Sequence, residues 1–424
     1  MQALNALKSR LLDLAIRGKL VPQIDGENEV EQIGKAPKEN PFEIPKKWKW
    51  VRLDDIAPYG KCERIEACSF DRDTWLLNLE DIEKDTGRLL QKNKIIKNQG
   101  AKYLFNKGDV LYSRLRPYLN KVLVADEDGV CTTEIIPLKP KENTLSGSYL
   151  SFFLKSQYFV QYAVSQSYGV KMPRVGTATA KNALVALPPL DEQKRIVEKL
   201  ESLFAKIDTI QKSIDEVSQL GASLEKQLLQ SSISGKLVPQ LDEEPEVRQV
   251  GEAPEEAPFE IPEKWRWVKL SEVASLIAGQ SPDGTSITDN EGGLEFHQGK
   301  SFFSERFLDK SNKFTSDAKK LATPNSILLS VRAPVGDINI TPREVAIGRG
   351  LCAIKPNSYL DLTFCFYVLS CYKEYFQSRS TGSTFKAITM NIVKNVTIPL
   401  PPIQEQKRIV AKLDKLMLEI QKLK

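Results

Sequence analysis

Two arginines in a strand-like run have the spacing that suits contact with DNA bases. Arg114 and Arg116 stand two positions apart in GDVLYSRLRP, residues 108–117. Alternate residues of a β-strand lie on one face, so we expect both guanidinium groups to point the same way. A guanidinium can donate two hydrogen bonds to the O6 and N7 atoms of guanine in the major groove. The pair therefore predicts a surface that reads bases.

A second run of the same kind, NSILLSVRAP, carries a single arginine, Arg332. Aligning Ser113 with Ser330 places Arg332 opposite Leu115, which lies on the other face of such a strand. Arg332 is therefore not equivalent to either arginine of the first run. Pairing with a carboxylate such as Asp337 is an equally good interpretation of this residue.

Basic residues gather in stretches that contain few or no acids. Residues 88–122 hold nine Lys or Arg and one acid, Asp109, and the stretches 146–190 and 375–404 hold no acid. Such stretches inside folded domains suit contacts with phosphates, although a single basic run is also typical of an ordinary solvated face. The net charge of the chain is only +5, and residues 242–256 carry seven acids against one Arg. The charge distribution is thus more informative than the total.

The sequence lacks the patterns expected of an enzyme. It has one histidine, His297, and none of its six cysteines forms a C-x-x-C pair, so neither a histidine-based metal site nor a redox motif is predicted. There is no phosphate-binding glycine loop, and both Pro-Pro pairs follow Leu, not the Asn or Asp that a DNA amino-methyltransferase needs. We expect a non-catalytic, cofactor-free protein with reduced thiols, located in the cytoplasm. No apolar run is long enough to span a membrane.

The chain is two copies of one unit, joined in a circularly permuted order. The first copy begins in the middle of its repeat and the second ends in the middle of one, which predicts pseudo-two-fold symmetry. Two offsets, 217 and 213, relate the copies. The matching segments are GKLVPQ at 18–23 and 235–240, PFEIPKKWKWVRL at 41–53 with PFEIPEKWRWVKL at 258–270, and LPPLDEQKRIV at 187–197 with LPPIQEQKRIV at 400–410.

Each copy contributes to a long helix with apolar residues in alternating steps of four and three, the heptad pattern of a coiled-coil seam. About 43 residues of central helix make a rod of roughly 65 Å. We expect the two terminal helices to form a second, antiparallel rod against it. The predicted seam comprises Ile196, Leu200, Leu203, Ile207, Ile210, Ile214, Leu224 and Leu228 of the central helix, Leu4, Leu7 and Leu11 near the start, and Ile409, Leu413, Leu416 and Ile420 near the end.

Between the rods lie two segments that share a framework but differ in surface residues, and each mixes strand-like and helix-like runs. The predicted fold class is α+β: two similar mixed α/β domains separated by two long antiparallel helices. The expected boundaries are 1–17 for the N-terminal helix, 18–187 for the first domain, 188–234 for the central helix, 235–400 for the second domain and 401–424 for the C-terminal helix.

At these motifs the chain resembles the specificity subunits of type I restriction-modification enzymes. The resemblance covers nearly the whole length. It is carried by the two LPP…EQKRIV repeats, by WLLNLEDIEKDTG at 75–87 and GDVLYSRLRPYLNKV at 108–122, and by FHQGK at 296–300 and SILLSVRAPVGDINI at 326–340.

The resemblance implies that each domain recognises one half of a split double-stranded DNA target. It also implies that the helices set the spacing and bind two methyltransferase subunits, with nuclease-translocase subunits joining the complex. AdoMet, ATP and Mg²⁺ would then belong to those partners. The candidate DNA contacts are Tyr112, Arg114, Arg116, Lys121, Lys171 and Arg174 in the first domain, and Gln298, Lys300, Arg332, Ser383, Thr384 and Lys386 in the second.

Two other functions compete with this interpretation. A scaffold that binds only proteins would show no DNA retention at moderate salt. A stand-alone DNA-modifying enzyme would need a methyl-donor site, and the sequence contains no pattern for one.

Overall fold

The computed structural model describes residues 2–66, 73–95, 100–254, 257–382 and 386–423. The chain divides into two units, Met1–Ser213 and Ile214–Lys424, and the boundary falls inside the long helix α6. Each unit contains one mixed α/β domain, which we call the first domain (residues 49–187) and the second domain (residues 266–400). This confirms the predicted fold class of two such domains with a long helix between them. Among the described residues, no helix is long and apolar enough to cross a membrane.

The helices have lengths from a single turn to 44 residues. They are α1 Gln2–Ile16, α2 Leu53–Ile56, α3 Gly147–Lys155, α4 Gln157–Ser165, α5 Thr177–Asn182, α6 Leu190–Ile233, α7 Leu270–Val273, α8 Leu362–Cys371, α9 Lys373–Ser378, α10 Met390–Lys394 and α11 Ile403–Gln421, with 3-10 turns η2 Leu79–Asp81, η3 Pro117–Leu119, η4 Gly284–Ser286 and η5 Lys300–Phe302.

The first domain is built from a five-stranded sheet of order β2-β5-β8-β3-β4, a three-stranded sheet of order β7-β6-β9, and two strand pairs, β1-β12 and β10-β11. Its strands are β1 Lys49–Arg52, β2 Arg64–Glu66, β3 Trp75–Leu77, β4 Asn93–Lys94, β5 Ala101–Phe105, β6 Val110–Ser113, β7 Val122–Val124, β8 Gly129–Cys131, β9 Ile135–Leu138, β10 Ser167–Tyr168, β11 Arg174–Val175 and β12 Leu184–Leu187.

The second domain repeats this plan with a five-stranded sheet of order β15-β17-β16-β21-β18, a four-stranded sheet of order β14-β22-β19-β20, and the pair β13-β23. Its strands are β13 Arg266–Lys269, β14 Ala274–Ala278, β15 Ile287–Thr288, β16 Leu294–His297, β17 Phe314–Thr315, β18 Leu321–Ala322, β19 Ser326–Ser330, β20 Ile338–Thr341, β21 Val345–Ile347, β22 Leu351–Pro356 and β23 Thr397–Leu400.

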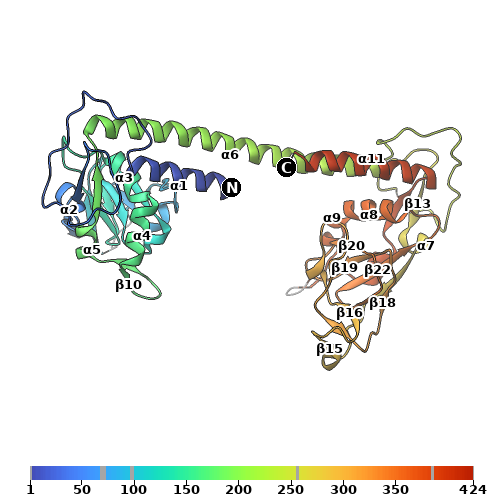
Figure 1. The fold of residues 1–424 in the computed structure, drawn as a ribbon. Coiled ribbons are helices and arrows are strands. Elements are labelled where there is room, and N and C mark those ends of the chain that lie inside the picture. Colours follow the sequence, from blue (N-terminus) through green and yellow to red (C-terminus); the bar gives the residue numbers. More distant parts are fainter. Residues whose placement is uncertain (1, 67–72, 96–99, 255–256, 383–385, 424) are drawn as a thin grey trace. The chain divides into compact units, whose positions relative to one another are not determined.

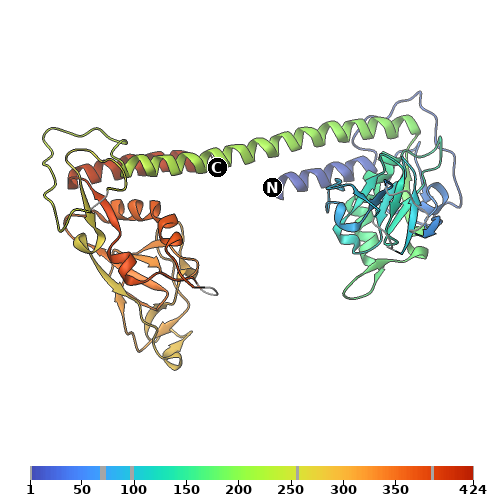
Figure 2. The same cartoon turned by 180° about the vertical axis from the view of Figure 1, so that it is seen from behind.

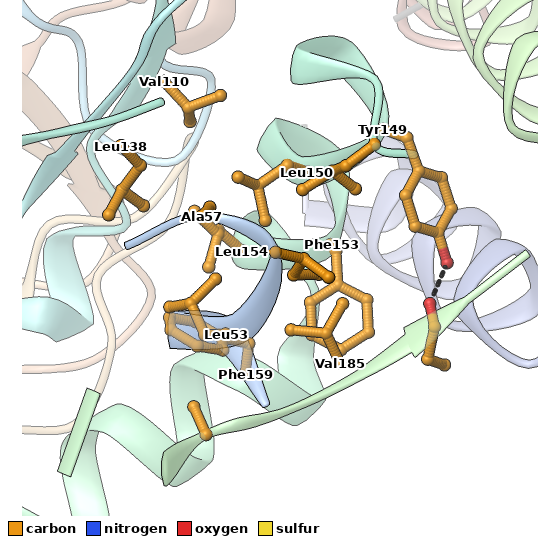
Figure 3. Close-up of a cluster of buried hydrophobic side chains, with 14 of the residues drawn as sticks. Leu53, Ala57, Val110, Leu138, Tyr149, Leu150, Phe153, Leu154, Phe159 and Val185 are labelled. Atoms are coloured by element: carbon orange, nitrogen blue, oxygen red, sulfur yellow. Dashed lines mark hydrogen bonds between the residues drawn. The ribbon is translucent and has the colours of Figure 1, made fainter. Parts of the chain in front are cut away.

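The core of the first domain lies where α2, α3 and α4 pack on the three-stranded sheet and on β12 (Figure 3). Leu53, Phe153 and Val185 are fully buried there. The hydroxyl of Tyr149 donates to the carbonyl of Ala186 at 2.7 Å, so this aromatic ring is buried with its polar group satisfied. In the second domain α8 takes the place of α3, and Asp361 caps it by accepting hydrogen bonds from the amides of Thr363 and Phe364.

The first part of α6 runs antiparallel to α1 within the first unit. The ammonium group of Lys8 in α1 forms an ion pair with Asp208 of α6 and lies over the ring of Phe204. In the second unit, α11 runs back along the last part of α6 (Figures 1 and 2), and Ile409 shares a core with Ile233. The predicted antiparallel packing is therefore present in each unit.

The repeated LPP…EQKRIV motif forms the corner that holds each domain on its helix. In the first unit, Glu192 accepts a hydrogen bond from the buried indole nitrogen of Trp48 at 2.9 Å. The side chain of Gln193 donates to the carbonyl of Thr144 at 2.9 Å and accepts from the amide of Ser146 at 2.8 Å, so it clasps the segment that leads into α3. These contacts explain why Glu192 and Gln193 of the motif are polar although they are buried.

The second unit repeats each contact of this corner. Trp265 donates to Glu405 at 3.0 Å, and Gln406 donates to Tyr359 and accepts from the amide of Asp361. The arginines of the two motifs also correspond, since Arg195 pairs with Glu27 and Arg408 pairs with Glu244. The recurrence of the sequence is thus a recurrence of one set of hydrogen bonds.

The glycine after each helix is required by its geometry. Gly18 follows α1 and Gly235 follows α6, with φ angles of 67° and 71°. A Cβ atom on Gly235 would lie 2.1 Å from a side-chain carbon of Pro262, and one on Gly18 would lie 2.3 Å from Pro45. Only glycine combines a positive φ with this close approach.

The predicted seam is only partly buried. Ile196, Leu200 and Ile207 of α6 and Ile409, Leu413 and Ile420 of α11 are buried, and Leu4, Leu11, Leu203, Leu228 and Leu416 are partly buried. By contrast Leu7, Ile210, Ile214 and Leu224 are 43–50% exposed. The prediction for α1 was wrong in detail, because its most buried side chains are Leu12, Ala15 and Ile16, which join the core of the first domain.

Candidate nucleic-acid interface

In the first domain, strand β6 leads directly into the predicted arginine pair. The strand ends at Ser113, and the segment after it is held by the hairpin of β10 and β11. The amide of Val175 donates to the carbonyl of Arg114 at 3.0 Å, and the amide of Arg116 donates to the carbonyl of Pro173 at 2.7 Å. The structure therefore brings the arginine pair next to the loop of the β10-β11 hairpin, which contains Gly169 and lies more than 50 residues later in the sequence.

The expectation that Arg114 and Arg116 share one face of a strand was wrong. Arg116 has a φ of 51°, in the left-handed region, because it turns the chain into η3 before Pro117. This conformation is uncommon for residues other than glycine and is often found at functional sites. The Nε atom of Arg116 is buried and has no hydrogen-bond partner among the described residues.

Arg114 and Arg174 share the carboxylate of Glu134. The Nε atom of Arg114 lies 3.2 Å from one carboxylate oxygen, and an Nη atom of Arg174 lies 2.8 Å from the other. Burial would raise the pKa of Glu134, but the hydrogen bonds from the two arginines outweigh it and hold this pKa below its usual range. Two guanidinium groups against one carboxylate leave the cluster with a net positive charge.

Two other candidates of the first domain do not face solvent in the way a DNA contact requires. Tyr112 is only 4% exposed and packs edge-on against Tyr59 and Phe159, so it belongs to the core and the prediction for this residue was wrong. Lys121 is half-buried and donates to the carbonyl of Leu79 at 2.6 Å, which fixes η2. Lys171 is exposed at the tip of the β10-β11 hairpin.

The second domain has the same backbone arrangement around Arg332. Ser330 ends β19, and its hydroxyl donates to the carbonyl of Arg332 at 2.9 Å, as that of Ser113 does to Leu115 at 3.0 Å. Arg332 forms a bridge with Ala387, as Leu115 does with Arg174. The predicted alignment of Arg332 with Leu115 is therefore confirmed.

Arg332 is exposed and lies beside a hollow of about 170 Å³ that Arg349 also lines. Gln298, which directly follows β16, lies close to the residue after Arg349. A Cβ atom on this residue, Gly350, would lie 2.4 Å from the carbonyl oxygen of Gln298. The side chain of Gln298 is exposed and accepts a hydrogen bond from Ser281 at 2.9 Å. Lys386, also exposed, accepts from the amide of Ala333 through its carbonyl. The predicted residues Gln298, Arg332 and Lys386 are thus on neighbouring segments.

Lys300 lies apart from this edge. It pairs with Asp337 at 2.5 Å, and Lys373 approaches the other oxygen of the same carboxylate at 2.6 Å. Among the described residues, the ion pairs of Asp337 are with these two lysines, so the alternative of an Arg332–Asp337 pair was wrong. Lys300 is engaged in the protein, which makes it a weaker candidate for DNA.

The single histidine is a packing residue. His297 is buried, contacts the ring of Phe302 edge-on and hydrogen-bonds to Glu295 at 2.8 Å. Burial lowers the pKa of His297. Burial alone would raise the pKa of Glu295, but hydrogen bonds from Arg343, the Ser311 amide and His297 lower it to about 2. This cluster fixes the end of β16, which carries Gln298.

Ser383 and Thr384 lie outside the described residues. Within the described part of the chain there is no group of residues that could hold a metal ion, and the cysteines described there are free thiols. Two site residues were missed by the sequence reasoning. Glu134 has no motif that marks it, whereas Arg349 stands between two glycines in AIGRGLC, a pattern that indicates close backbone approach.

Comparison with known proteins places these features in a family. The profile of the "Type I restriction modification DNA specificity domain" matches residues 45–219 and 262–424, which together make up well over half of the chain. The chain belongs to the type I restriction-modification DNA specificity family. The two matches correspond to the two repeats, and each includes one domain and one copy of the helical motif.

Members of this family resemble the chain over most of its length. The type I restriction enzyme MjaX specificity subunit of Methanocaldococcus jannaschii is 30% identical over 390 residues, covering 88% of this chain and 87% of that protein. The HsdS subunit of Thermoanaerobacter tengcongensis has a TM-score of 0.62 at 27% identity and covers 91% of this chain and 93% of its own.

A chain from a structure on the assembly and conformational transition of a type I restriction-modification system is also similar. Its TM-score is 0.71 at 29% identity, with coverage of 90% of this chain and 93% of that chain. The relatives of the present chain are thus specificity subunits. This agrees with the prediction of a non-catalytic chain that works with DNA and with other restriction-modification subunits.

Proposed function

We propose that the chain reads a bipartite DNA target, with one half recognised by each domain. The observation that carries this proposal is the recurrence of one backbone arrangement with different side chains. In the first domain, the segment after β6 is bridged to a later part of the chain through Leu115 and Arg174. In the second domain, the segment after β19 is bridged in the same way through Arg332 and Ala387. The first domain places Arg114, Arg116 and Arg174 there, and the second places Arg332. A shared frame with unlike side chains suits two unlike half-sites.

The charges of the first domain support contact with DNA. The Arg114–Glu134–Arg174 cluster is cationic, and the buried Nε of Arg116 has no partner among the residues described. Lys171, Lys386 and the other basic residues of these edges would supply phosphate contacts.

Selection from a random duplex pool tests this function. The full chain with a type I methyltransferase subunit should enrich two unlike fixed sequences separated by a spacer of constant length. Raising the salt should weaken binding steeply, because phosphate contacts release counterions. A single uninterrupted motif, or no enrichment, would refute the bipartite reading. Failure to retain any DNA at moderate salt would favour a protein-binding scaffold.

We further propose that the helices dock two methyltransferase subunits, one for each repeat. The support is an exposed apolar row on α6, since soluble proteins rarely leave such a row uncovered. Ile210, Ile214, Val217, Leu220 and Leu224 are 42–69% exposed along this helix. AdoMet, ATP and Mg²⁺ would be held by the partner subunits. Such a complex acts on DNA inside a prokaryotic cell, which places the chain in the cytoplasm.

Polar substitutions on this row test the docking. Changing Leu220 and Leu224 together to Lys should abolish co-purification with the methyltransferase subunit, because two charges would be buried in an apolar interface. The matched control changes the exposed Glu201 and Glu198 of α6 to Lys. Equal co-purification of wild type and the leucine variant would contradict this part of the proposal.

The domain boundaries follow from the same assignment. We take 18–187 and 235–400 as the two recognition domains, 188–234 as the central helix, and 1–17 with 401–424 as the two parts of the second rod. The terminal helices would then set, with α6, the spacing between the two half-sites.

A further inference from the structure

The hairpin of β10 and β11 is a separate two-stranded ribbon in the first domain. Its strands pair antiparallel, with Ser167 opposite Val175 and Tyr168 opposite Arg174. They form a sheet of their own. Figure 1 shows the hairpin projecting beyond the rest of the first domain. Residues 169–173, with the sequence GVKMP, make its tip.

The tip presents apolar side chains to solvent. Val170 is 100% exposed, and Tyr168 and Met172 are 60% and 49% exposed. Val170 has the highest exposed fraction of any large apolar side chain among the described residues. Apolar groups collected on a projecting element are typical of a contact surface.

The backbone of the tip is defined by its own geometry and by the segment after β6. Gly169 has a φ of 97°, and a Cβ atom there would lie 3.1 Å from the carbonyl oxygen of Met172. Where the tip joins β11, the carbonyl of Pro173 accepts the hydrogen bond from the amide of Arg116. The hairpin is therefore attached to the arginine pair, and whatever the arginines bind lies close to the hairpin.

The charges around the tip favour a nucleic acid as the bound molecule. Lys171 lies within the tip and Arg174 at its base, and the stretch 146–190 contains no acid. A protein partner for Val170 and Met172 would need only an apolar surface. An apolar tip bordered by cations matches a DNA groove, where apolar base substituents lie between two rows of phosphates.

We propose that this hairpin enters the major groove at the first half-site and that Val170 and Met172 contact the C5-methyl group of a thymine. The major groove admits a two-stranded β-ribbon, and thymine is the base that presents a methyl group there. This inference rests on the proposed function. It adds apolar side chains that recognise an A·T pair, beside arginines that can hydrogen-bond to guanine.

The second domain carries different residues at the corresponding positions. The bridges Leu115–Arg174 and Arg332–Ala387 set the register, and this register aligns Val170 with Ser383 and Met172 with Phe385 in the sequence. Ser383 and Phe385 lie outside the described residues. The inference concerns the first domain, where the corresponding residues Val170 and Met172 are described.

Replacing thymine with deoxyuridine tests the contact, because it removes only the methyl group. The full chain with its methyltransferase subunit is bound to its selected duplex, and then to duplexes in which thymines of the first or second half-site are replaced. Wild type should lose affinity by about fourfold for each methyl contact removed from the first half-site. A chain with Val170→Ala and Met172→Ala should bind the thymine and deoxyuridine duplexes equally.

The control variant is Leu90→Ala, which removes another exposed apolar side chain of the first domain and should preserve the preference for thymine. Three outcomes would overturn the inference: a first half-site without an A·T pair, an equal response of wild type and the hairpin variant to deoxyuridine, or loss of methyltransferase binding by the hairpin variant without DNA. If wild type selects no sequence at all, the proposed function itself fails.

Discussion

Arg114 and Arg116 are neighbours in sequence but are positioned by different means. Arg114 is oriented by a side chain, Glu134, which also holds Arg174. Arg116 is oriented by its backbone, through the left-handed turn and the hydrogen bond to Pro173. A guanidinium held in place loses less conformational entropy when it binds a base. Both arrangements therefore suit specific readout better than a mobile surface cation does.

Arg114→Ala and Arg116→Ala should each relax recognition of the first half-site and leave preference at the second half-site unchanged. The cost should be ~1–3 kcal/mol for an arginine that pairs with guanine. Binding measured across a panel of single-base variants checks this. Arg332→Ala is the matched control, since it should relax the second half-site only. Uniform weakening across all sequences would instead assign the arginines to phosphates.

The Glu295–His297–Arg343 cluster should make the second domain sensitive to acid. The lowered pKa of His297 means that the unfolded chain binds a proton more readily, so stability should fall as the pH drops below 6.5. The lowered pKa of Glu295 adds a further loss as the pH falls from 4.5 towards about 2. Hydrogen exchange of peptides from β16, followed as a function of pH, measures both losses.

The matched variant is Glu295→Gln, which should reduce stability at neutral pH and flatten the loss below pH 4.5. The first domain contains no histidine and should show no change near pH 6.5 from this cause. A second domain whose protection is constant between neutral pH and pH 4.5 would show that His297 does not stay neutral in the folded chain.

At the scale of elements, the corner between each domain and its helix is the most constrained part of the fold. A buried carboxylate is unfavourable by itself, and burial raises the pKa of Glu192 and of Glu405. The indole donors Trp48 and Trp265 offset part of this cost. Such a polar contact specifies one docking orientation, which an apolar contact of the same size would not.

Trp48→Phe should destabilise the first unit by ~1–3 kcal/mol, because it removes the indole hydrogen bond to the buried carboxylate of Glu192 and leaves only that of Gln23. The same complex should accept a wider range of spacer lengths, since the angle between the first domain and α6 would be less fixed. Trp265→Phe is the matched variant for the second unit. Loss of stability with an unchanged spacer preference would show that the corner serves folding alone.

Much of the element-level plan was predictable, because the repeat marks each element twice. The heptad steps and the flanking proline and glycine gave the limits of α6, and the paired runs GDVLYSRLRP and NSILLSVRAP correspond to β6 and β19. The role of the polar corner residues was not predictable. Trp48 and Glu192 are 144 positions apart, and no local pattern shows that they meet.

The candidate site was predicted less well than the fold, for physical reasons. Arg114 was a candidate from its spacing with Arg116, and Arg174 from the resemblance to the family, but their joint partner Glu134 follows from tertiary structure. Tyr112 was a candidate only through the family motif that contains it, and every residue of its strand, β6, is buried. The heptad pattern marks Ile210, Ile214 and Leu224 as seam residues but does not show what covers them, and all three are exposed in the structure.

At the scale of the whole molecule, the two domains are attached to their surroundings in the same way. In the first, the amide of Leu53 donates to the carbonyl of Ala183 at 2.8 Å, beside the β1-β12 pair. In the second, the amide of Leu270 donates to the carbonyl of Val396 at 2.9 Å, beside the β13-β23 pair. Each domain is therefore an insert between two equivalent strands, and one insert can replace the other.

The most direct test of independent recognition is a chain in which residues 53–183 are replaced by residues 270–396. Bound with its methyltransferase subunits and selected from a random duplex pool, it should enrich the second half-site twice, as an inverted repeat with the original spacer. A folded, methyltransferase-bound chimera that still enriches the first half-site, or enriches only one copy of the second, would show that the domains do not read DNA independently.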